Sequence, residues 1–178
     1  MKKLTVLLAL LAALTLALAL TGCGGEATPT EPEAVVFMEP EMEADAFSET
    51  AGGMLMDILR DGAEGTPLDN AQRMTIQAGL PFQCVAVEIQ PGLLTGFGNN
   101  EITGFTQGAM FGPTMSPVPF IGYIFALEEG ADADAFCQTL MEASDLSWNV
   151  CITAEQKVAS VSEDGSTVYF LMTDKELG

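Results

Sequence analysis

Hydrophobic residues recur at helical spacing in two parts of the chain. From 44 to 61 they lie three and four positions apart, as on one face of a helix. Gly62 is the expected C-cap of this helix, and "GAEGTPLDN" after Asp61 predicts a turn-rich loop. A second helix is expected to begin within "EEGADADAF", with Asp132 and Asp134 in its first turn, where carboxylates favour the positive end of the helix dipole.

Alternating or continuous apolar runs of strand length predict the remaining elements. These runs are 83–90, 120–127, 148–152, 158–162 and 167–172. The uninterrupted apolar run at 120–127 is typical of a central strand. The last two runs predict a hairpin closed by Asp164 and Gly165, a dipeptide that favours tight turns.

The stretch from 91 to 119 is rich in Gly, Phe and Met and almost uncharged. Asn99 and Asn100 suggest a hairpin turn between 93–97 and 101–106. A long loop inside a compact domain is usually functional, and Met adapts to varied apolar ligands and soft metals. The candidate binding residues are therefore Phe97, Phe105, Met110, Phe111 and Met115. The alternative is that these side chains cover a core.

The order of elements predicts an α+β fold for a single domain, residues 44–178. Successive strands without intervening helices favour a mixed or antiparallel sheet of about five strands, with two helices packed on one face.

The N-terminus has the order of a secretory signal: Lys2 and Lys3, then an uncharged apolar stretch over 4–20. Leu20-Thr21-Gly22-Cys23 resembles the lipobox of bacterial lipoproteins. This resemblance implies that 1–22 is a signal peptide cleaved between Gly22 and Cys23, and that Cys23 carries the lipid. Two acyl chains, at about 0.8 kcal/mol per buried methylene, would then hold the chain in a membrane. The alternative is an uncleaved helical anchor with an incidental cysteine.

Residues 23–43 are dominated by Gly, Thr, Pro and Glu, which predicts a lipidated acidic tether. Its short apolar island, Val35 to Met38, is alternatively an edge strand. The expected location is the outer face of the bacterial cytoplasmic membrane. The segment from Tyr123 to Asp174 is loosely similar to short uncharacterised lipoproteins of anaerobic monoderm bacteria, a similarity that implies no activity.

Charge and composition narrow the function classes. The 25 acidic residues outnumber six basic ones, for a formal net charge of −19, so nucleic acid is not an expected partner. The chain has no histidine, the commonest general base and metal ligand. Asp132 and Asp134 do not continue into a calcium-binding loop, and helix capping explains them. We expect no metal, no cofactor and no catalysis.

Three cysteines follow Cys23, so at most one internal disulfide is possible, and Cys137 with Cys151 is the candidate pair. Free buried thiols are the alternative, because reactive cysteines need an electropositive setting. We expect Cys84 to lie on the mixed, more exposed side of its strand.

The best interpretation is a membrane-anchored, non-catalytic binding or scaffolding module that contacts an envelope protein or peptide. One alternative is a small-solute or cation receptor associated with a transporter. Another is an envelope enzyme that uses carboxylates or Cys84.

Overall fold

The computed structural model describes residues 36–37, 49–115, 118–149 and 151–177. The expected signal peptide, its cleavage site at Gly22 and Cys23, and most of the tether lie outside the described residues. Val36 and Phe37 form a short strand, β1 (Val36–Phe37), that pairs with the sheet, so these two residues of the apolar island form an edge strand, as the alternative had it.

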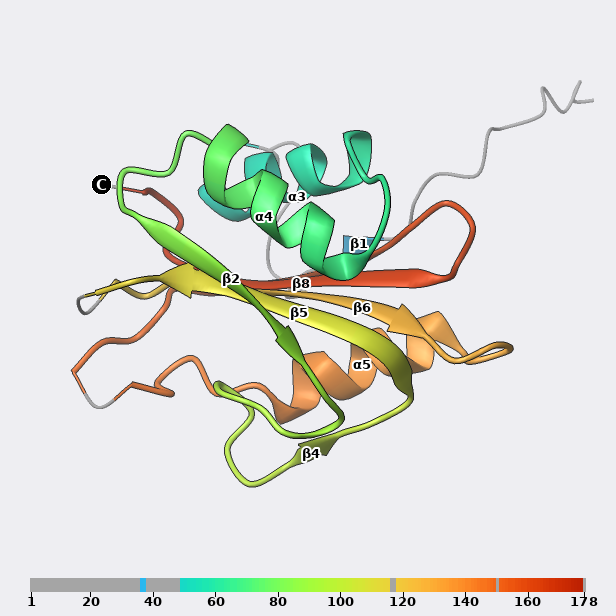
Figure 1. Cartoon of the computed structure of the whole chain (residues 1–178). Helices are drawn as coiled ribbons and strands as arrows, with labels where there is room; N and C mark the ends of the chain where they lie inside the picture. The colour runs from blue at the N-terminus through green and yellow to red at the C-terminus, as the bar shows by residue number, and fades with distance from the viewer. Residues whose placement is uncertain (1–35, 38–48, 116–117, 150, 178) are drawn as a thin grey trace, which may run out of the picture. The chain divides into compact units, whose positions relative to one another are not determined.

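An antiparallel sheet of six strands forms the centre of the described structure, in the order β1-β7-β8-β6-β5-β2 (Figure 1). Besides β1, its strands are β2 (Cys84–Ile89), β5 (Phe105–Pro113), β6 (Ile121–Leu127), β7 (Gln156–Val161) and β8 (Thr167–Thr173). Two short strands, β3 (Gly92–Leu93) and β4 (Glu101–Ile102), pair in a separate small sheet.

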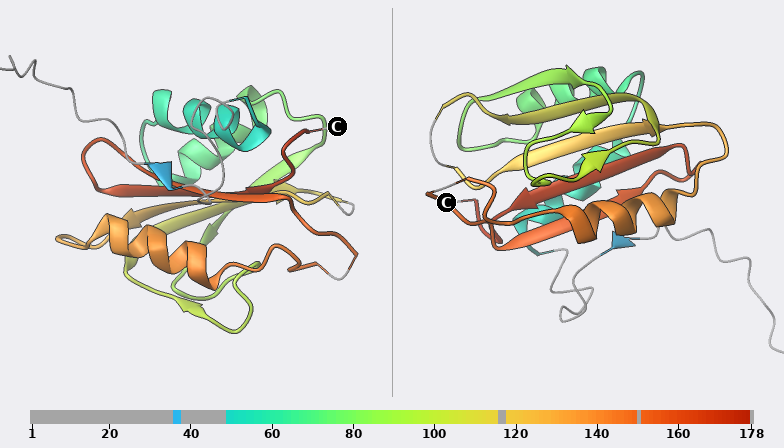
Figure 2. Two further views of the ribbon diagram at one scale, coloured as in Figure 1. Left: turned by 180° about the vertical axis from the view of Figure 1, so that it is seen from behind. Right: turned by 90° about the horizontal axis from the view of Figure 1, so that it is seen from below.

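Helices cover both faces of this sheet (Figures 1 and 2). Helices α3 (Ala51–Asp61) and α4 (Pro67–Gln77) lie on one face, and α5 (Ala133–Ala143) lies on the other. Strand β8 shows why: Tyr169 and Leu171 pack in the cluster with α3 and α4, whereas Phe170 packs in the cluster with α5. The α+β class is confirmed, but packing on one face is not, because the two predicted helices lie on opposite faces.

The loop predicted over 62–70 is wrong from Pro67 onward, where helix α4 begins, and no element was predicted for the rest of this helix. Thr66 begins the helix with a capping box: its hydroxyl accepts from the Asp69 N–H at 3.2 Å, and the Asp69 carboxylate accepts from the Thr66 N–H at 2.9 Å. Pro67 stands at the first turn, where its missing N–H is harmless. Burial of Ala71 and Met74 against the sheet completes the stabilisation.

The nine-residue strand β5 was also missed, because Gly108 and Gly112 have low strand propensity. The tertiary structure explains one of them. A Cβ at position 108 would lie 2.8 Å from side-chain carbons of Ile89 and Phe105, so the neighbours use the space that glycine leaves. Strands β3 and β4 pair in the region of the predicted hairpin, but only Leu93 of the predicted first arm is in a strand, and a loop over 94–100 replaces the tight turn predicted at Asn99 and Asn100.

The strand predicted over 148–152 is wrong, since only an isolated bridge joins Asn149 and Ile152. Two other local predictions are confirmed. The β7–β8 hairpin turns at Gly165, whose φ of 72° suits glycine, and the Asp132 carboxylate caps α5 by accepting from the Ala135 N–H at 3.0 Å.

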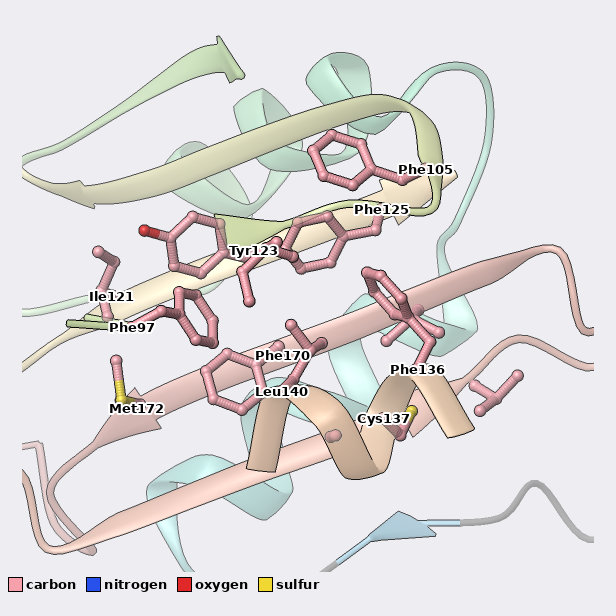
Figure 3. Packing of buried hydrophobic residues seen from close by; sticks show 14 of the residues in the cluster. Phe97, Phe105, Ile121, Tyr123, Phe125, Phe136, Cys137, Leu140, Phe170 and Met172 are labelled. Carbon is pink, nitrogen blue, oxygen red and sulfur yellow. The ribbon is translucent and has the colours of Figure 1, made fainter. Parts of the chain in front are cut away.

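The core has two layers, one on each face of the sheet. Aromatic rings dominate the layer beneath α5, where Phe97 lies 5.4 Å from Tyr123 and 5.3 Å from Phe170 between ring centroids (Figure 3). The Tyr123 hydroxyl donates to the Thr95 carbonyl at 2.6 Å. Burial raises the pKa of Tyr123 far above its usual value, so this group stays a donor.

Candidate functional site: an acidic cleft

The five predicted binding residues do not form one surface. Phe97 and Phe105 are buried beneath α5, and Phe111 is buried on the opposite face with α3 and α4. Phe105 and Phe111 would point to the same face of a regular strand. A register shift between Phe105 and Gln107 turns them to opposite faces. Met110 is half-buried, and Met115 is 79% exposed. Most of these side chains therefore cover the core, which was the alternative.

The three cysteines of the described residues are free, so Cys137 and Cys151 are not bonded to each other. Cys84 faces the α3 and α4 layer and is half-buried, whereas the exposed side of its strand carries Val85 and Val87; the placement of Cys84 on the more exposed side was wrong. Burial raises the pKa of Cys84 to about 11. Burial, with the nearby charge of Asp134, raises the pKa of Cys137 to about 12. Neither thiol suits a nucleophile at neutral pH.

A cleft of about 670 Å³ is lined by the α3–α4 connection and by the turn of the β7–β8 hairpin. We call it the acidic cleft. Its lining consists of Arg60, Asp61, Ala63, Glu64, Gly65, Asn70, Ser162, Glu163, Asp164, Ser166, Thr167 and Tyr169.

The helical wall of the cleft is held by two polar side chains of α4. Asn70 is buried, accepts from the Glu64 N–H at 2.9 Å and donates to the Thr66 carbonyl at 3.0 Å, which ties the connection to the helix. Arg73 donates to the carbonyls of Ile58 and Leu59 at 3.1 and 3.3 Å. These are end-of-helix carbonyls of α3 that would otherwise lack partners.

The opposite wall is the hairpin turn, which is organised around Asp164. Its Oδ1 accepts from the Ser162 hydroxyl at 2.7 Å, the Ser166 hydroxyl at 2.8 Å and the Ser166 N–H at 3.0 Å. These hydrogen bonds lower the pKa of Asp164 below its ordinary value, so the turn keeps a negative charge at neutral pH.

Tyr169 lies at the base of the cleft and is 2% exposed. Its ring packs in the core beneath α3 and α4, while no hydrogen bond to its hydroxyl is found in the part of the chain that the structure describes. Ser160, directly opposite on β7, is fully buried and its hydroxyl also has no described partner. Ser160 does not line the cleft, so Tyr169 is the residue of this pair that offers hydrogen-bonding capacity to a ligand there.

Negative charge dominates the lining, because it includes four acidic residues, Asp61, Glu64, Glu163 and Asp164, and one basic residue, Arg60. Arg60 has only a marginal ion pair with Asp57, at 3.9 Å between their closest atoms. Asp61 is the last residue of α3, where the negative end of the helix dipole disfavours a carboxylate. A bound cation would relieve this repulsion.

The residues that line the cleft come from two short segments about a hundred positions apart. Each resembles an ordinary polar turn in the sequence, so no local signal indicated the site. The fold brings them together because α3 packs over β7 and β8, while α4 packs beside it over β6, β5 and β2.

Within the described ranges, no three His, Cys, Asp or Glu side chains lie where they would share a metal ion. A second, smaller cavity of about 330 Å³ has apolar walls at Phe82, Pro119 and Leu177 and includes Asp174. The pKa of Asp174 is raised by burial and, to a smaller extent, by the charge of Glu155.

No helix in the described part of the chain is both long and apolar enough to span a membrane.

Comparisons with known proteins find no matching family model, no matching curated protein and no matching solved structure.

Proposed function

We propose that this chain is a lipid-anchored, non-catalytic binding module that takes up an organic cation in the acidic cleft. The observation that carries the proposal is the lining itself: four carboxylates against one guanidinium around about 670 Å³, with the Tyr169 hydroxyl at the base. An ammonium or guanidinium group is the chemistry that such a lining attracts.

An organic cation fits better than a bare metal ion. Calcium needs six to eight oxygen ligands that converge on one point, and no such group occurs among the described residues. An elongated cation instead places its donors against separate carboxylates. This proposal combines two interpretations of the sequence. The ligand is the one expected of a cation receptor, and the protein is non-catalytic, as expected of a binding module.

Binding is tested by thermal unfolding of the full-length protein with putrescine, spermidine, lysine amide and arginine amide. Ligand at a hundred times its dissociation constant adds about 2.7 kcal/mol to the free energy of unfolding. Butanol and Ca²⁺ serve as neutral and metal controls. An unchanged melting temperature with all four cations contradicts the proposal.

The location of binding is tested by paired variants of equal charge change. Glu64→Gln with Asp61→Asn removes two charges from the cleft and should weaken binding about tenfold or more. Glu101→Gln with Glu142→Gln makes the same change in net charge on exposed residues outside the cleft and should leave affinity within about twofold. Equal weakening by both pairs would show that only net charge matters.

The anchor is a separate part of the proposal. We expect Cys23 to incorporate palmitate and the native protein to require detergent for extraction, whereas Cys23→Ser should be released in soluble form. A membrane-bound chain that retains Met1 and an unmodified Cys23 would support the uncleaved anchor instead.

A further inference from the structure

Strand β2 forms one edge of the large sheet, and no described strand pairs beyond it (Figure 2). It is six residues long, and Glu88 is its single charged residue. Natural proteins usually protect such an edge with lysine, proline, a bulge or a covering element. Here Val85 and Val87 are instead 46% and 42% exposed on one side of the strand.

The pairing with β5 determines which backbone groups of β2 point outward. The Thr114 N–H donates to the Gln83 carbonyl at 2.9 Å, so these opposed residues form a hydrogen-bonded pair. Hydrogen-bonded and non-hydrogen-bonded pairs alternate in an antiparallel ladder. Residues 85, 87 and 89 therefore bond inward to β5. The N–H and C=O groups of Cys84, Ala86 and Glu88 point away from the sheet.

The outward backbone groups of these three residues can pair with the same groups of a second copy of the strand. In an antiparallel pair related by a twofold axis through Ala86, Ala86 lies opposite Ala86 of a second copy, and Cys84 lies opposite Glu88. All three positions then form hydrogen-bonded pairs. Val85 comes to lie opposite Val87, which gathers four exposed valines on one side.

The charge pattern suits this register. It places Glu88 opposite a neutral cysteine, so no like charges face each other within the strand pair. We propose that β2 is a self-association edge, through which two copies of this chain form one continuous antiparallel sheet centred on Ala86. The net charge of −19 opposes the approach of two copies, so dimerisation strengthens as salt shortens the screening length.

The register is tested by cross-linking in the full-length protein carrying Cys151→Ser, which removes an exposed thiol. In Glu88→Cys the new thiol lies opposite Cys84 of the second copy. Opposed Cα atoms of a hydrogen-bonded pair are about 5.5 Å apart, within the range that a disulfide bridges. Within one strand the two positions are about 13 Å apart and cannot bridge. Mild oxidation should therefore convert most of the protein to a covalent dimer.

Two matched controls make the result specific. Val87→Cys presents its thiol on the other side of the strand and should give no dimer above background. Glu88→Cys with Cys84→Ser should also give none, because each new thiol then lacks its partner. Cross-linking that persists without Cys84 overturns the register.

The second measurement is sedimentation of the uncross-linked native protein, where we expect a dimer that tightens with added salt. Ala86→Pro removes an outward N–H without touching the β5 ladder, and it should give a folded monomer. Should Ala86→Pro fail to fold, Val87→Glu provides the same test with every backbone donor intact. A native protein that is monomeric at 100 μM (about the upper limit of a specific weak dimer), or a dimer unaffected by these variants, overturns the proposal.

Discussion

Phe111 on β5 lies directly opposite Gly122 on β6, and its ring occupies the space that a Cβ at position 122 would need. Gly122 has no positive φ, so it is glycine for reasons of space and not of backbone conformation. The bulky ring and the missing side chain form one packing unit at the centre of the sheet.

Gly122→Ala should destabilise the protein by about 1–3 kcal/mol, because it inserts a methyl group into a filled core. Denaturant unfolding measures the loss. Gly112→Ala is the matched control, since a Cβ there meets only the Phe120 carbonyl at 3.6 Å, and it should change stability by less than about 0.5 kcal/mol. Phe111→Leu should restore part of the loss in the double variant. Simple addition of the two single effects would contradict the packing explanation.

Tyr123→Phe and Tyr169→Phe remove the same atom from two buried tyrosines with different hydrogen bonding. The first deletes the bond to the Thr95 carbonyl and should lower the free energy of unfolding by about 1 kcal/mol. The second should leave stability nearly unchanged and weaken cation binding in the acidic cleft. Equal losses of stability would show that the Tyr169 hydroxyl has a partner in the folded protein.

Asp164→Ala should destabilise the β7–β8 turn at neutral pH, by about 1 kcal/mol because the turn is open to solvent. The folded-state pKa of Asp164 is below its ordinary value of 3.8, so its contribution is present above pH 3.8 and is lost as pH falls through the folded-state pKa. Thermal unfolding from pH 7 to pH 2 should show the native and variant proteins converging in acid. A constant difference across this range would exclude the charged hydrogen bonds as the cause.

Cys84 should react slowly with iodoacetamide at pH 7, since a pKa of about 11 leaves a thiolate fraction of about 10⁻⁴. The labelling rate should rise about tenfold per pH unit up to that pKa. Exposed Cys151 in the same sample is the internal control and should react much faster, as peptide mass spectrometry would measure. Rapid labelling of Cys84 at pH 7 would instead support the alternative that the protein is an enzyme that uses this thiol.

Local signals in the sequence were enough to predict several elements. The uninterrupted apolar run at 120–127 predicted the central strand β6, and Asp132 and Asp164-Gly165 predicted a helix start and a hairpin turn. Helix α4 was not predicted, because its capping signal lies among loop-forming residues. Strand β5 was not predicted, because its glycines disfavour strands when considered alone.

The acidic cleft could not be predicted from the sequence, because Asp61 ends helix α3 and Glu163 lies in the β7–β8 turn, and only the packed layers bring the two together. For the same reason, the sequence could not show that the aromatic residues of 91–119 are buried, and they were predicted to bind a ligand. The burial of Phe97 and Phe105 depends on helix α5 and on strands that follow later in the chain, and the burial of Phe111 depends on α3 and α4 on the other face.

The amino-acid sequence by itself determined the α+β class, the acidic charge and the positions of most turns, because periodicity, charge and turn chemistry act between near neighbours. Only the tertiary structure decided which face each helix covers, that Phe97 and Phe111 are buried on opposite sides of the sheet, and that an edge and a cleft stay open. These features depend on contacts between segments far apart in the chain, and such contacts cannot be predicted from a local sequence pattern.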